Sequence, residues 1–316
     1  MANKVTLQPE PTVQFLLEGF SNDITDYIAE QVLPEVPSET LTGYFGRLAD
    51  GAMRIITTVV KGLAKNIVNY EFDRNASFEV VDHALENPIT AAEAERLGGW
   101  DIAKQTIGMQ MEDDLRRSRE NGLAAALTST SVITHNFTLT GADQWTTKTS
   151  EVLSRINVAK AAIEAATGKV ANLIILGAPT FRALQFHPEM IAALAPGKAT
   201  PGIYNEAQMA AAFGVDRVLV GRAIYNSAKE GATATPTFIW GDNCIVAYVS
   251  PSALARFAKT LGARVACPKK APKQYAGSYV PEGKNADQVQ VLVVGSNWED
   301  KLITTGAAYL IKDTNA

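Results

Sequence analysis

The sequence has few of the residues that build catalytic and metal sites. Its 316 residues include three histidines and two cysteines. Cys244 and Cys267 are far apart and lack the spacing of metal ligands, so we interpret both as reduced packing thiols. His83, His135 and His187 have no cysteine or acidic residue at ligand spacing, and His187, which precedes a proline, is typical of a loop or packing residue. The sequence therefore predicts no metal site.

Motifs of the common enzyme classes are absent as well. There is no GxGxxG after a strand, no Walker phosphate loop, no GxSxG elbow and no HExxH pair. Gly177 follows an apolar run, but one glycine cannot line a phosphate-binding nest of backbone amides. Asp113 and Asp114 are helix neighbours that point about a third of a turn apart, which is typical of a solvated face rather than an acid–base pair. We therefore predict no catalytic or cofactor-binding residue.

The sequence also lacks a strong net charge and a long apolar run. The formal net charge is -4 and the pI is near 5.5, so the chain as a whole does not attract nucleic acid or anionic membrane. No apolar run reaches the length of a membrane span, and no signal segment opens the sequence. With 47% hydrophobic residues the chain has ample material for a core. We expect a protein that works, or is assembled, inside a cell.

The most informative stretch is residues 87–128, which predicts a short helix followed by a long one. Thr90 and Glu93 have the spacing of a capping box at a helix start. Gly98 and Gly99 interrupt the pattern, and residues 101–127 contain no proline and many strong helix formers, with an aspartate able to cap the first turn. The second helix would be roughly 40 Å long, more than a compact domain needs.

This long helix has only a narrow apolar seam. Ile107, Met111 and Leu115 recur every four residues, while charged side chains surround most of the rest, including the acidic run Glu112, Asp113 and Asp114. Acid-first pairs four residues apart, 112 with 116 and 113 with 117, support the helix. Two interpretations remain open: a solvated surface helix, or a spine across the molecule that other subunits touch.

Two segments before this helix have little core of their own. Residues 1–40 form a polar start, an apolar stretch and then Leu33-Pro34-Glu35-Val36-Pro37, whose prolines enforce an extended chain, as in an arm that crosses a surface. Residues 41–81 contain strand formers with basic residues between them and predict a two-stranded hairpin, which is only marginally stable unless it lies on something else. The basic residues are Arg47, Arg54, Lys61 and Lys65.

The second half of the chain changes to an α/β pattern. Residues 150–166 predict an amphipathic helix that stops at Gly168, and the apolar run 172–176 predicts a strand buried on both faces. Strand-like runs follow at 237–249, with a tight turn at 241–243 between two of them. Near the end, two more strand-like runs, 289–294 and 302–311, predict strands on either side of a turn at Gly295-Ser296-Asn297.

Several phrases, in their shared order, resemble the major capsid proteins of tailed bacteriophages over nearly the whole chain. They are IAEQVLPEVP at 28–37, GYF at 43–45, an expected strand and helix at 78–88, the charged helix, GVDRVLVGRAIYN at 214–226, IWGD at 239–242 and AYV at 247–249. The resemblance implies an α+β fold of the HK97 type. Mapped onto this sequence, it implies an N-terminal arm (1–40), an E-loop hairpin (41–81), a P-domain with the spine helix (82–149), an A-domain (150–252) and a return to the P-domain (253–316).

The function that the resemblance implies is structural. Copies of the chain would form hexamers and pentamers of an icosahedral phage head around double-stranded DNA, assembled in the host cytoplasm and retained in the virion. Portal, scaffolding and decoration proteins are the implied partners, and the lack of a long extension before the arm favours a separate scaffolding protein. An encapsulin-like bacterial compartment is the alternative within this fold, and a soluble α/β enzyme is the alternative from another class.

One hypothesis joins the hairpin to the spine. In the resembled fold an E-loop lies over the P-domain of the adjacent subunit. We therefore expect the basic side chains of the hairpin to meet the acidic run of the spine between subunits, with small contributions per pair because exposed ion pairs are weak. The residues of this expected contact are Arg47, Arg54, Lys61, Lys65, Glu112, Asp113 and Asp114.

Overall fold

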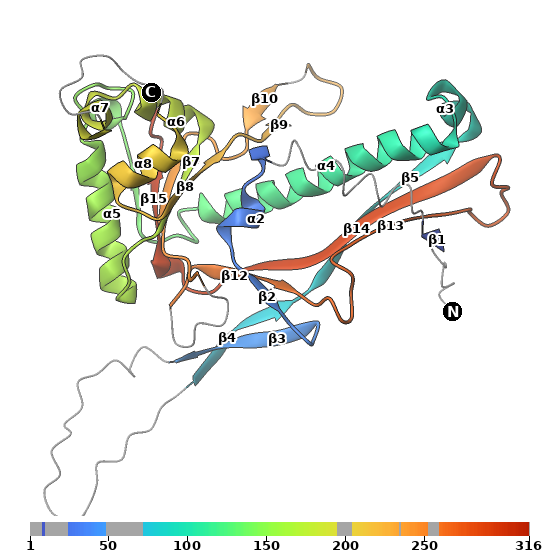
Figure 1. Cartoon of the computed structure of the whole chain (residues 1–316), viewed down its shortest axis with the longest axis horizontal. Coiled ribbons are helices and arrows are strands. Elements are labelled where there is room, and N and C mark those ends of the chain that lie inside the picture. The colour runs from blue at the N-terminus through green and yellow to red at the C-terminus, as the bar shows by residue number, and fades with distance from the viewer. Residues whose placement is uncertain are drawn as a thin grey trace, which may run out of the picture.

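The computed structural model describes residues 8–9, 25–48, 72–194, 204–233, 235–251 and 259–315. Figure 1 shows an elongated molecule in which one long helix, α4 (Trp100–Leu127), runs alongside a long strand, β14 (Val289–Leu302). A helical lobe lies at one end of this pair, and a ribbon of two strands points away from the body. The architecture is mixed α and β, built on two main sheets.

The first sheet is organised around β14. Its strand order is β1-β13-β14-β12-β2, and β5 pairs with the free side of β14. β14 is 14 residues long; residues 289–298 pair with β5, residues 291–296 pair with β13, and residues 299–302 pair with β12. The other strands of this sheet are β1 (Gln8–Pro9), β2 (Glu35–Pro37), β5 (Val81–Thr90), β12 (Gly262–Ala266) and β13 (Gln274–Tyr279).

The turn predicted at Gly295-Ser296-Asn297 is wrong, because these residues lie inside β14. Gly295 is opposite Tyr275 of β13, and a Cβ on Gly295 would stand 2.3 Å from Cζ of the tyrosine ring. The glycine thus serves a close approach between strands rather than a turn. The second predicted run, 302–311, divides between the end of β14 and β15 (Ala308–Lys312) of the other sheet.

The strand and helix expected at 78–88 are also corrected. This segment is the end of β4 (Phe72–Glu79) followed by β5, and it contains no helix. Ten residues of β5 pair with β14, from Thr90 opposite Val289 to Val81 opposite Trp298. Pro88 fits in this strand because the other edge of β5 has no strand partner among the described residues.

The short helix begins as the sequence predicts, whereas the long helix has a different cap. Thr90 and Glu93 form both contacts of a capping box at the start of α3 (Ala91–Arg96). Gly98 and Gly99 both have positive φ, and Gly99 rather than Asp101 is the N-cap of α4. Positive φ is a conformation that glycine adopts at little cost, so these two glycines allow the chain to turn between α3 and α4.

The second sheet has the order β6-β15-β11-β7-β8. β7 is buried throughout, which confirms the prediction of a strand covered on both faces. Ile174 and Leu176 pack toward helices α5 to α8, and Leu173 and Ile175 pack toward the end of α4. The strands are β6 (Asn136–Thr138), β7 (Leu173–Gly177), β8 (Arg217–Gly221), β11 (Cys244–Ala247) and β15; the helices are α5 (Val152–Thr167), α6 (Ala178–Gln185), α7 (Pro188–Leu194) and α8 (Glu206–Phe213).

This sheet does not follow the expected domain boundaries. β6 and β15 come from segments expected in the P-domain, yet they pair with each other, and β15 also pairs with β11. The runs around residues 241–243 do not form a hairpin either. β10 (Pro236–Phe238) pairs with β9 (Ile224–Asn226), whereas β11 pairs with β7 and β15. The helix predicted at 150–166 is confirmed as α5, with Gly168 as its left-handed C-cap.

The remaining two-stranded sheet is the ribbon of β3 (Thr42–Leu48) and β4. Its strands are antiparallel, with a register shift between Phe45 and Arg47. The rings of Phe45 and Phe78 are 5.3 Å apart and pack on a small cluster of Val80, Val265 and Cys267. The ribbon is therefore attached to the body only near its base, within the part of the chain that the structure describes.

Candidate functional site: the contact between the arm and the spine helix

The spine helix α4 belongs to two hydrophobic cores. Near its start, Ala103 and Met111 pack on Ile89 of β5 and Leu292 of β14. At its end, Leu123, Ala124 and Leu127 pack against the second sheet and against residues of the arm. The arm residues in this second core are Ile28, Ala29, Val32 and Leu33. The helix therefore connects the two sheets, and the arm is fixed where they meet.

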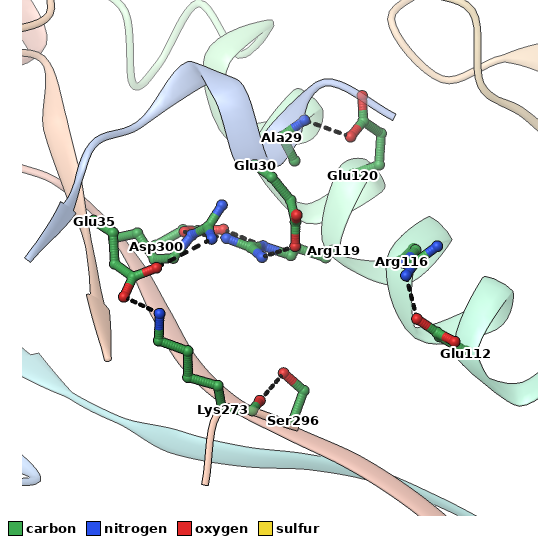
Figure 2. A network of polar contacts seen from close by, with 11 residues as sticks. Ala29, Glu30, Glu35, Glu112, Arg116, Arg119, Glu120, Lys273, Ser296 and Asp300 are labelled. Carbon is green, nitrogen blue, oxygen red and sulfur yellow. Dashed lines mark hydrogen bonds and ion pairs between the residues drawn. The ribbon is translucent and has the colours of Figure 1, made fainter. Parts of the chain in front are cut away.

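We call residues 25–37 the arm root. It contains α2 (Ala29–Val32) and β2, which pairs in parallel with β12. The apolar side of the arm root is almost fully buried: Val32 is 0% and Ala29 1% exposed. Residues 25–37 are thus anchored on the body, and Figure 2 shows the polar contacts that join them to α4 and to the first sheet.

Glu120 is the centre of this network. Its side chain is 0% exposed and accepts hydrogen bonds from the backbone N–H of Ile28 at 3.0 Å and of Ala29 at 2.7 Å. It also accepts from Nε1 of Trp240, 2.5 Å away. Burial raises the pKa of Glu120, against the three N–H donors and Arg119, which lower it. One carboxylate thus joins the arm, the spine and the segment between β10 and β11.

Arg119 forms the second contact, on the neighbouring face of the helix. Its guanidinium donates Nε and Nη2 to the two oxygens of Asp300, at 2.9 and 3.0 Å, and Nη1 to Glu30 of the arm at 3.0 Å. The side chains of Arg119 and Asp300 are only 9% and 11% exposed. The guanidinium carbon also lies 5.1 Å from the ring centroid of Trp298, which stacks on His83. The bidentate pair joins α4 to β14, and the contact with Glu30 joins the arm root to Arg119.

Arg264 of β12 completes the network. Its guanidinium lies 3.7 Å from Asp300 and 3.9 Å from Glu35 of the arm, and Lys273 contacts the other oxygen of Glu35 at 2.5 Å. Nε and Nη2 of Arg264 are buried without a hydrogen-bond acceptor among the described residues. Burial and the nearby charge of Arg119 lower the pKa of Arg264, while the surrounding carboxylates raise it. Ion pairs therefore hold β2 in addition to its backbone pairing.

The acidic run expected to face other subunits has partners inside its own subunit. Glu112 is buried, its pKa is raised by burial, and it pairs with Arg116. Asp113 pairs with Arg117 and accepts a hydrogen bond from the Tyr27 hydroxyl at 2.6 Å. Asp114 pairs with Arg117 at 2.8 Å. These contacts confirm the predicted helix pairs, but only Asp113 and Asp114 keep substantially exposed side chains, 39% and 42%.

The basic half of that expected contact cannot be placed. Arg54, Lys61 and Lys65 lie outside the described residues, and of Arg47 only the backbone in β3 is described. The meeting of the two halves between subunits therefore stays a prediction. The part that sequence reasoning missed is the pair Arg119 and Glu120. Glu120 stands four residues before Ala124 and three before Leu123, so an acid within an apolar stripe was the available signal.

His187, the two cysteines and Gly177 have packing roles. His187 is 2% exposed and contacts the Ser150 hydroxyl at 3.1 Å, which confirms the packing interpretation. Cys244 and Cys267 are buried and not joined to each other, and burial raises the pKa of the Cys244 thiol. Gly177 approaches the Gly241 carbonyl, where a Cβ would stand 1.9 Å from the oxygen, so its glycine serves packing. Among the described residues no cluster of His, Cys, Asp and Glu could hold a metal, and none of their helices is long and apolar enough to cross a membrane.

Comparisons with known proteins point to one class. No protein-family model matches the chain. It is 24% identical over 242 residues to the major capsid protein of Burkholderia phage BcepMu, and the matched part covers 76% of each chain.

A phage-related protein of Bordetella bronchiseptica RB50 has a similar structure, with a TM-score of 0.68 at 18% identity over 98% of both chains. The capsid of cyanophage P-SCSP1u matches with a TM-score of 0.56 at 9% identity, over 90% of this chain and 87% of that one. The chain thus resembles the major capsid proteins of bacteriophages in sequence and has the mixed α/β, HK97-like fold of phage capsids, as its sequence predicted.

Proposed function

We propose that this chain is the major capsid protein of a tailed bacteriophage, and that its copies assemble as hexamers and pentamers into an icosahedral head around double-stranded DNA. The observation that carries the proposal is the sequence likeness to the BcepMu capsid protein combined with a capsid fold over nearly the whole chain. In this role the chain is a building block rather than an enzyme.

The geometry of the subunit supports a role in assembly. The ribbon of β3 and β4 has no other strand partner among the described residues, and a two-stranded sheet is marginally stable alone. The other edge of β5, which is ten residues long, also has no strand partner among the described residues. Contacts between copies in a closed shell would cover such surfaces at every position by symmetry.

The proposal implies partners and a place. Portal and scaffolding proteins would direct assembly in the host cytoplasm, and decoration proteins would bind the outer surface of the virion. Packaged DNA would be held without sequence-specific contacts, consistent with the net charge of -4. The expected division into arm, E-loop, P-domain and A-domain belongs to the same proposal, and within it we assign β6 and β15 to the A-domain because they share a sheet with β7, β8 and β11.

The test is the state of the purified protein. We expect the chain, expressed alone or with a scaffolding protein from the same phage, to elute at megadalton mass on gel filtration and to form closed shells in electron micrographs. A protein that stays a monomer or small oligomer under both conditions would contradict the proposal. That result would favour the soluble α/β enzyme.

A second measurement separates a phage head from an encapsulin-like compartment. Particles recovered from phage-infected cells should contain nuclease-protected double-stranded DNA. Shells that exclude DNA in those cells and instead retain a protein cargo through a short terminal peptide would identify a compartment. The two outcomes share the fold and differ in content, so mass and morphology alone cannot distinguish them.

A further inference from the structure

The arm root meets the spine helix through a carboxylate that faces only donors. The three groups within hydrogen-bond distance of Glu120 are the N–H of Ile28, the N–H of Ala29 and Nε1–H of Trp240. None of them can accept a hydrogen bond from a protonated carboxyl group. An ionised carboxylate can accept all three at once. A glutamine of the same shape would turn an NH2 group toward at least one of these donors.

Trp240 is itself fixed on the second sheet. Its side chain is 1% exposed, and a Cβ on Gly221 of β8 would stand 2.0 Å from Cδ1 of the indole. The ring therefore lies flush against a glycine that leaves room for it. A second contact runs beside it, because the backbone N–H of Arg222 donates to the carbonyl of Asp26 in the arm root at 3.3 Å. The arm root thus contacts the end of β8 as well as α4.

We propose that Glu120 is the positioning residue of the arm root: its ionised carboxylate, oriented by Trp240, holds residues 25–37 in one position on α4 and the second sheet before any neighbouring subunit is met. A segment fixed in advance lowers the entropy that assembly must remove. The importance of this position for shells rests on the proposed function. The position itself does not.

The first test is hydrogen exchange on the unassembled protein. In the wild type the amides of Ile28 and Ala29 should be protected, and in Glu120→Gln they should exchange about 10-fold faster or more, because a buried donor loses its acceptor. Amides of β7 should keep their wild-type rates. Glu112→Gln is the matched control, since Glu112 is also a buried acid of α4 but pairs with Arg116 of the same helix rather than with the N–H groups of Ile28 and Ala29. It should leave the amides of Ile28 and Ala29 unchanged.

A milder variant guards against loss of folding. Trp240→Phe keeps an aromatic ring but removes one of the three donors, and it should speed exchange at Ile28 and Ala29 by a smaller factor. Unchanged exchange at both amides in the two variants would overturn the proposal. So would faster exchange of β7 by the same factor as the arm root, since Glu120 would then support only overall stability.

Assembly gives the second readout. Glu120→Gln subunits that remain folded should form fewer or irregular shells, whereas Glu112→Gln subunits should assemble as the wild type does. If the wild type forms no shells, the proposed function fails while the exchange result still decides the role of Glu120. If Glu120→Gln loosens the arm root but assembles into normal shells, a fixed arm root is not needed before assembly and the proposal is overturned on that point.

Discussion

Tyr275 of β13 lies across Gly295 of β14 and reaches Asp82 of β5, two strands away. Its hydroxyl donates to the two carboxylate oxygens of Asp82 at 2.9 and 2.8 Å, and a Cβ on Gly295 would stand 2.4 Å from the hydroxyl oxygen. One side chain thus connects all three strands of this part of the sheet, and the absence of a side chain at Gly295 makes the connection possible. β13 and β5 both pair with β14 along this stretch.

The first prediction follows from this contact. Gly295→Ala should destabilise the subunit by about 1 to 3 kcal/mol, the range for overpacking a filled site, because the ring of Tyr275 must move and release Asp82. Gly122→Ala is the control. Gly122 lies in the interior of α4 with open space around its Cα, so alanine there should stabilise by roughly 0.5 to 1 kcal/mol. Urea unfolding of both variants measures the two effects, and equal shifts would contradict the assigned role of Gly295.

Gly295 also shows where sequence reasoning ends. A glycine, a serine and an asparagine in succession are typical turn residues, and only the position of Tyr275 in three dimensions reveals a strand. Local signals were sufficient for the capping box at Thr90 and the buried strand β7, because the residues that decide them are neighbours in the chain. Glu120 was not predicted as a site because its partners lie about 90 and 120 residues away.

The second prediction concerns the pair of Arg119 and Asp300. Both side chains are nearly buried and their contact is bidentate, so Arg119→Ala removes two hydrogen bonds from the carboxylate of Asp300 and leaves Arg264, 3.7 Å away, as its charge partner. We expect a loss of about 3 kcal/mol in the free energy of unfolding, the lower end of the range for a buried pair that loses one partner, because Arg264 still compensates part of the charge. Arg155→Ala, which removes the pair with Asp143 at the surface, should cost at most about 1 kcal/mol. Denaturant unfolding of the two variants under identical conditions decides, and comparable losses would show that the buried pair has no special role.

The third prediction is a dependence on alkaline pH. Burial, together with the hydrogen bond to Asp113, raises the pKa of Tyr27 from 10.0 to about 12. A phenol whose pKa is higher in the folded than in the unfolded state stabilises the fold below pH 10, and this contribution disappears as the pH rises from 10 to 12. Tyr27→Phe should therefore be less stable than the wild type at pH 8, and the difference should shrink by pH 12. A spectrophotometric titration of tyrosinate would check the assignment, because the variant should lack one late-titrating group.

The last prediction returns to the acidic run of the spine. Asp113 and Asp114 are the exposed members of that run, so a lysine at either position meets solvent and the nearby Arg117 rather than a core. The double change Asp113→Lys and Asp114→Lys should leave the subunit folded. It should weaken assembly more at low than at high salt if the basic hairpin of another copy meets this face, because salt screens exposed charges.

The structure separates the two aspartates: Asp113 also accepts a hydrogen bond from Tyr27, whereas the contacts of Asp114 are with Arg117 and Gln110 of the same helix. Asp114→Lys alone therefore isolates the charge effect, and Tyr27→Phe alone isolates the loss of the arm contact. Light scattering during assembly at two salt concentrations separates these causes. Normal assembly of Asp114→Lys at low salt would leave this face merely solvated, and a defect shared by Asp113→Lys and Tyr27→Phe, independent of salt, would assign it to the arm.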